Sequence, residues 1–65
     1  MMIEAATIMF QDADSLEEAA VIDRYDNDQV ALCISFKSGG DFEVVMIKAD
    51  AIRLMEGLEK TLRQI

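Results

Sequence analysis

The sequence predicts a small α+β domain, in which a four-stranded antiparallel sheet is followed by one C-terminal helix. Three observations predict this fold class. Apolar runs of strand length fill the chain before residue 48, the pair Gly39-Gly40 separates the last two runs, and an amphipathic pattern of helical period fills the remainder. With 65 residues the chain is one domain at most, and we take it as 1–65.

The first half of the chain allows two interpretations. Residues 2–10 (MIEAATIMF) show no helical period, and residues 20–25 (AVIDRY) are rich in strand formers, so both are expected to be strands. Between them, Ser15 and Glu18 have the spacing of a helix capping box. We favour strand, acidic loop, strand, giving the order ββββα. A short helix within residues 15–22 would give the alternative order βαββα.

Residues 30–38 (VALCISFKS) and 41–47 (DFEVVMI) are expected to form a hairpin, because two glycines separate runs of β-branched and aromatic residues. The length of the turn decides the register. A two-residue turn places Phe42, Val44 and Met46 on the same face as Cys33. A three-residue turn places them with Leu32, Ile34 and Phe36 instead.

From Ala49 onward the chain is expected to be an amphipathic helix. Arg53 is expected on its polar face, and Gly57 lies off its apolar stripe, where a tolerated surface glycine is the simplest interpretation. The stripe is made of these residues: Ala51, Leu54, Met55, Leu58, Leu62 and Ile65.

The composition predicts a homo-oligomer, most simply a two-fold dimer. A chain this short has marginal stability unless disulfides, a metal or a partner add to it. Its single cysteine, Cys33, excludes an internal disulfide, yet 52% of the residues are hydrophobic. Because one helix covers only one face of the sheet, the other face is expected to associate with another chain. The residues predicted for this interface are Phe42, Val44, Met46 and Ile52.

The net charge of −7 lies entirely in the first half of the chain. Residues 1–32 hold eight acids and one base, or −7, whereas residues 33–65 hold five of each. This charge disfavours direct binding to nucleic acid or to anionic membranes. No apolar run reaches the roughly 20 residues of a membrane span. The start of the chain lacks a basic segment, so a cytoplasmic location is expected.

Two Asp-x-Asp stretches, Asp12 to Asp14 and Asp26 to Asp28, resemble the start of a calcium loop, but neither has the required glycine at position six or glutamate at position twelve. Turn formation explains them better. Cys33 has no basic neighbour in sequence and is interpreted as a packing residue. The chain contains no histidine, and we expect no cofactor, no bound metal and no catalytic activity.

The predicted function is that of a small non-enzymatic, protein-binding regulator or inhibitor. An acidic segment would present carboxylates to a basic partner, including a protein that handles nucleic acid. Its predicted partner-binding residues are Asp12, Asp14, Asp23, Asp26 and Asp28. A solvated acidic surface without a partner explains the same charges. Two other classes remain open: single-stranded nucleic-acid binding through the sheet, and an enzyme with a site between subunits.

Overall fold

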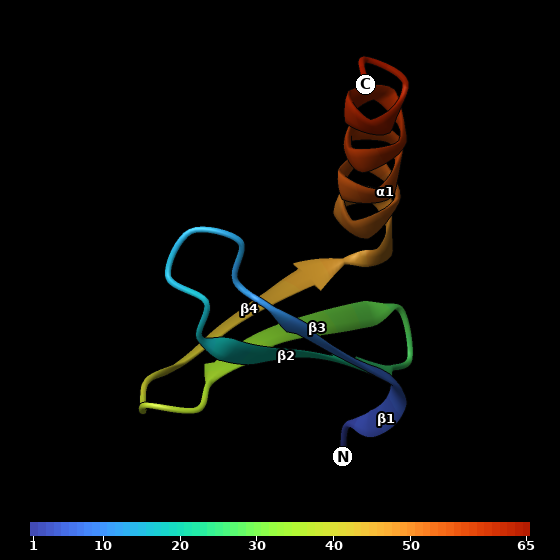
Figure 1. Cartoon of the computed structure of the whole chain (residues 1–65). Helices are drawn as coiled ribbons and strands as arrows, with labels where there is room; N and C mark the ends of the chain where they lie inside the picture. The colour runs from blue at the N-terminus through green and yellow to red at the C-terminus, as the bar shows by residue number, and fades with distance from the viewer.

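A computed structural model describes residues 1–65 and has the order ββββα (Figure 1). The strands are β1 (Ile3–Gln11), β2 (Glu18–Asp26), β3 (Gln29–Phe36) and β4 (Asp41–Ile47), and they are followed by helix α1 (Lys48–Leu62). The four strands form one antiparallel sheet in the order β1-β2-β3-β4. The predicted fold class is therefore confirmed, and the segment from Glu18 to Ile22 is strand, not the helix of the alternative order.

Short connections keep neighbouring strands antiparallel. Between β2 and β3 the turn has two residues, Asn27 and Asp28, and Asn27 has a φ of 53°. Asparagine tolerates this left-handed conformation better than most residues, which explains its position in a tight hairpin. The pairing of β1 with β2 is regular apart from a shift in register between Glu4 and Ala6.

The β3–β4 connection decides the register that the sequence left open. Ile34 lies opposite Phe42, and Leu32 lies opposite Val44. The turn includes Gly39, whose φ of 111° suits glycine alone. Paired residues share a face of the sheet, so Phe42 and Val44 lie with Leu32 and Ile34. The faces are those of the three-residue alternative, although four residues (37–40) separate the two strands, so neither predicted turn length is found. The placement of Phe42, Val44 and Met46 beside Cys33 is wrong.

Helix α1 begins directly after β4 and rises away from the sheet instead of lying flat on it (Figure 1). The backbone N–H of Lys48 donates to the carbonyl oxygen of Asp28 at 2.8 Å, which ties the start of the helix to the β2–β3 turn. Elsewhere α1 approaches only β3 and β4. None of its residues is buried, so hydrogen bonding along its own backbone is its main local support.

The chain has almost no interior of its own. Only Ala19 and Ala31 are buried, and neither has a large side chain. The radius of gyration of the Cα atoms is 13.0 Å, whereas a compact domain of this length has about 11 Å. The helix is too short and too polar to cross a membrane. A fold with regular strands and no enclosed core leaves its apolar side chains on the surface, where they define the candidate site.

Candidate protein-binding surface

One face of the sheet carries most of its large apolar side chains. The register of the three strand pairs and the alternation of side chains along each strand assign residues to this face. We call it the apolar face, and its residues include Ile8, Phe10, Val21, Tyr25, Val30, Leu32, Ile34, Phe36, Phe42, Val44 and Met46. The opposite face is mixed, with the ion pair between Arg24 and Glu43 at 3.6 Å among its apolar residues.

A groove of about 730 Å³ lies between the apolar face and helix α1. Its floor includes Ile8, Phe10 and Leu32, and its helical wall includes Leu54 and Leu58. The polar groups on its walls are few: the Asp23 carboxylate, the Arg53 guanidinium and the Thr61 hydroxyl. The hydroxyl already donates to the carbonyl oxygen of Gly57 at 2.9 Å. The groove therefore offers mainly aliphatic surface, with one acid and one base.

The helix does not turn the centre of its predicted apolar stripe toward this groove. Leu54 and Leu58 line it, but so do Arg53 and Gly57, which the sequence placed off the stripe. Arg53 thus lies at the edge of the groove while its side chain stays 80% exposed. Met55 and Leu62, also in the stripe, are 55% and 58% exposed and do not line the groove. The apolar surface of α1 thus extends beyond what its own sheet approaches.

The residues predicted for the oligomer interface are accessible. Phe42 is 60% exposed and Val44 is 49% exposed, and both lie on the apolar face. This is the face that borders α1 across the groove, so their expected position on the face away from the helix is wrong. Met46 lies on the same face and is half-buried. Ile52 lies on α1, outside the groove, and is also exposed. Their use in association stays a prediction.

The total surface of the chain is larger than a protein of its mass normally exposes. Its solvent-accessible area is 5306 Å², whereas a folded monomer of this mass exposes about 4,200 Å². The excess is about 1,100 Å². A standard protein–protein interface buries about 800 Å² on each partner, so the excess is sufficient for one such interface.

The five acids predicted to bind a partner do not lie on one surface. Asp12 and Asp14 lie in the loop between β1 and β2, whereas Asp26 and Asp28 lie at the β2–β3 turn. Strand β2 separates these two groups by about 26 Å, at 3.3 Å per residue. Asp23 lies between them along the strand and points into the groove. Only the two pairs of neighbouring acids remain as compact acidic sites.

Asp12 organises the loop that contains it. Its Oδ1 atom accepts hydrogen bonds from the backbone N–H groups of Asp14 at 2.8 Å and Ser15 at 3.1 Å. These bonds, the one from Ser15 first, hold the pKa of the Asp12 carboxyl below its ordinary value of 3.8. The structure thus places Asp12 in the turn role that the sequence favoured over calcium binding. The other stretch forms a tight turn, in which Asp26 lies 3.5 Å from the N-terminal amine.

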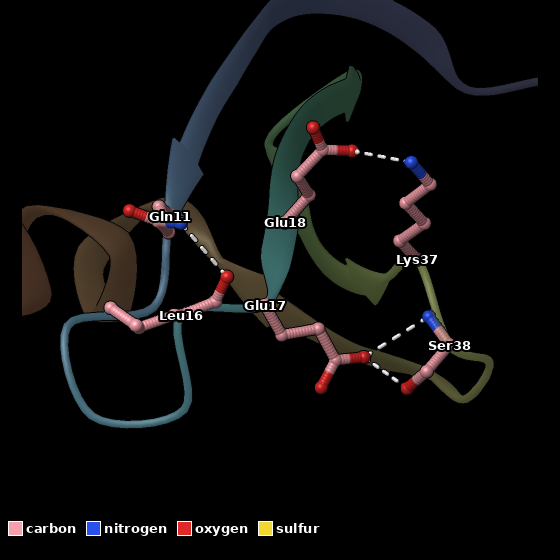
Figure 2. Close-up of polar contacts among 6 residues, drawn as sticks. All are labelled: Gln11, Leu16, Glu17, Glu18, Lys37 and Ser38. Carbon is pink, nitrogen blue, oxygen red and sulfur yellow. Dashed lines mark hydrogen bonds and ion pairs between the residues drawn. The ribbon is translucent and has the colours of Figure 1, made fainter.

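A polar cluster at one end of the sheet joins two loops that are distant in sequence (Figure 2). One carboxylate oxygen of Glu17 accepts hydrogen bonds from the backbone N–H of Ser38, at 3.0 Å, and from the Ser38 hydroxyl. Beside it, Lys37 pairs with Glu18 at 3.2 Å. Sequence analysis missed this cluster, because its two halves are about 20 positions apart and have no local motif. Both of its acids, Glu17 and Glu18, lie in the acidic stretch between Asp12 and Asp28.

Other candidate chemistry is sparse. No group of three or more cysteine and carboxylate side chains converges in a way that could hold a metal ion. Cys33 is a free thiol of intermediate exposure on the mixed face, and Ile22 and Glu43 are its cross-strand neighbours. The two aromatic residues Phe36 and Phe42 lie on the apolar face, whereas Arg24 lies on the opposite face. In binding of single-stranded nucleic acid through the sheet, these aromatic rings would stack on bases and Arg24 would contact phosphates, but they lie on opposite sides of the sheet.

Comparisons of the chain with protein-family models, with curated proteins and with solved structures give no match.

Proposed function

We propose that this chain is a small non-enzymatic, protein-binding regulator or inhibitor that works as a homo-oligomer. The observation that carries this proposal is the absence of any large buried side chain beside an excess of exposed apolar surface. Large exposed apolar patches mark surfaces at which proteins meet other proteins. Under this proposal the apolar face and α1 serve assembly, and the charged ends of the sheet stay accessible to another protein.

The chemistry of the groove supports binding over catalysis. Its walls are mostly aliphatic, and the Thr61 hydroxyl is engaged with its own helix. The one carboxyl with a clearly shifted pKa is that of Asp12, and backbone N–H groups of its own loop cause that shift. A perturbed carboxyl in a cleft would suggest acid–base work. Here the perturbed carboxyl lies in a surface loop and organises a turn.

The partner of the assembled protein is proposed to be basic. Two pairs of acids support this, one in the β1–β2 loop and one at the β2–β3 turn. At the turn, Asp28 is exposed through its side chain, while its backbone carbonyl holds the start of α1. Carboxylates in such positions steer oppositely charged partners and set association rates more than affinity.

A pull-down from native lysate tests this function. The wild-type chain is expected to retain basic proteins that mass spectrometry identifies, and the variant Asp26→Lys with Asp28→Lys is expected to lose them. A matched control replaces Glu56 and Glu59 on α1 by lysine, which changes the net charge equally and leaves the turn intact. Equal recovery of the same partners by all three proteins would refute the role of the acidic turn.

Sheet-mediated binding of single-stranded nucleic acid is the second candidate. The observation in its favour is that Tyr25, Phe36 and Phe42 share the apolar face, where aromatic rings stack on bases in many such proteins. Against it, Arg24 and Lys37 are occupied by Glu43 and Glu18. A gel shift at low salt separates the candidates, since tight binding of an oligonucleotide would reverse their order.

A further inference from the structure

The apolar face contains one carboxylate whose position is unusual. Asp23 lies two positions after Val21 on β2, so both side chains are on the apolar face. Its cross-strand partner on β3 is Leu32. It is half-buried and makes no ion pair within the chain. Covering this face with apolar atoms alone would leave a desolvated charge, which is costly without a partner.

Arg53 lines the same groove as Asp23, from α1, and is the one basic residue among the groove residues. Within its own chain Arg53 pairs with Asp50, one helical turn away, at 3.3 Å. That contact is weak because both side chains are largely exposed, at 80% and 52%. Arg53 is therefore free to exchange Asp50 for a better partner when the groove closes.

The extent of the exposed surface indicates what closes the groove. A small apolar ligand would fill part of the 730 Å³. It would leave Phe42 and Val44 exposed at one side, and Met55 and Leu62 on the helix beyond the groove. An excess of about 1,100 Å² corresponds instead to one protein interface.

The charges select a second copy of this chain over a partner of another kind. The whole chain carries −7, but the groove holds one acid and one base and is neutral. In a two-fold dimer, a contact between one residue of the first copy and another of the second is repeated with the copies exchanged, so one acid and one base form two ion pairs. In the same way the helix, which its own sheet leaves uncovered, can meet the apolar face of the second copy.

We propose that the groove is closed by α1 of a second copy in a two-fold dimer, with Arg53 of each copy paired to Asp23 of the other. This inference rests on the proposed function, because it names the partner in the self-association assumed there. It also assigns Asp23 to assembly, and so removes it from the acids available to a basic partner.

Charge reversal tests the pairing by sedimentation equilibrium. Asp23→Arg alone and Arg53→Asp alone each place like charges together at both symmetry-related contacts. Each is expected to weaken the dimer at least about 30-fold, the lower end for truncating one side of a buried charged pair. Mixed one to one, the two variants form a heterodimer in which both contacts again join opposite charges. The mixture is therefore expected to recover the wild-type association.

Two controls distinguish a pair between chains from a change in net charge and from a pair within one chain. Arg63→Asp changes the net charge as Arg53→Asp does, but it lies just beyond the helix end and outside the groove. Because Arg63→Asp keeps both Asp23 and Arg53, it is expected to dimerise as the wild type does. Mixing it with Asp23→Arg is expected to leave the Asp23→Arg chains dissociated. The double variant Asp23→Arg with Arg53→Asp restores opposite charges whether the pair forms within one chain or between two chains. The mixture of single variants restores them only between two chains, so the mixture is the decisive test. Circular dichroism of the same mixture reports recovery even where a dissociated variant is unfolded.

Three results would overturn the inference, and they are distinguishable from one another. No recovery in the mixture, with recovery in the double variant, assigns the pair to a single chain. Wild-type association of both single variants excludes the pair from the interface, while self-association and the proposed function stand. A monomeric wild-type protein overturns the inference together with the oligomer in the proposed function.

Discussion

Truncation of Leu58 to alanine separates an isolated chain from an assembled one. Leu58 lines the groove and is 62% exposed. Full burial of a leucine side chain contributes about 2 kcal/mol to the free energy of unfolding. In an isolated chain only about two-fifths of Leu58 is buried, so its truncation would lower that free energy by about 0.8 kcal/mol. In the proposed dimer Leu58 lies in a closed interface, where leucine-to-alanine changes cost at least about 2 kcal/mol.

Because the change occurs in both copies, the dimer is expected to lose at least about 4 kcal/mol, or nearly a thousandfold in its dissociation constant. Leu16 provides a matched control. It is 64% exposed in the loop between β1 and β2, far from the groove lining. Leu16→Ala is expected to leave the dissociation constant within about twofold. Analytical ultracentrifugation of both variants makes the comparison, and equal effects of the two truncations would refute the reasoning.

Two further predictions concern the loops. Asp12→Ala is expected to lower the melting temperature at neutral pH, because the lowered pKa of Asp12 means that its carboxylate stabilises the folded state. This stabilisation is complete above the pKa of the unfolded state, about 3.8, and is lost as the pH falls through the lower pKa of the folded state. The melting temperatures of the two proteins should therefore converge in acid. A difference that grows in acid would contradict the account. In a double-mutant cycle, Glu17→Ala and Ser38→Ala are expected to show a coupling of about 0.5–1.5 kcal/mol in chemical denaturation, and simple additivity would contradict the cluster of Figure 2.

The order of the elements was predictable because each has a local signature. Strand formers around Gly39-Gly40 predicted the last hairpin, and the helical period after Ala49 predicted a helix that begins at Lys48. The register was left open because it depends on turn length, which the sequence did not specify. The observed pairing of Ile34 with Phe42 fixes the faces of β3 and β4.

The contents of the candidate site were less predictable. Phe42 and Val44 were selected as exposed apolar residues, and they are exposed, but on the face that also includes Leu32. The meeting of Asp23 and Arg53 in one groove depends on the angle at which α1 leaves β4, and no spacing in the sequence encodes that angle. For the same reason, the acids between Asp12 and Asp28 looked continuous in sequence although a whole strand separates them in space.

The absence of a core suggests how folding and assembly are related. Because only Ala19 and Ala31 are buried, little apolar area is removed from water before a second chain arrives. For proteins of this kind, the stability of the fold cannot be separated from the concentration of the protomer. We therefore expect unfolding and dissociation to occur in one transition whose midpoint rises with protein concentration.

Sedimentation equilibrium of the wild-type chain over a dilution series, with circular dichroism on the same samples, tests the central claim most directly. The account predicts a folded species with twice the chain mass of 7.3 kDa, and loss of secondary structure in step with dissociation on dilution. A folded species of 7.3 kDa that keeps its secondary structure and a concentration-independent melting temperature would contradict it.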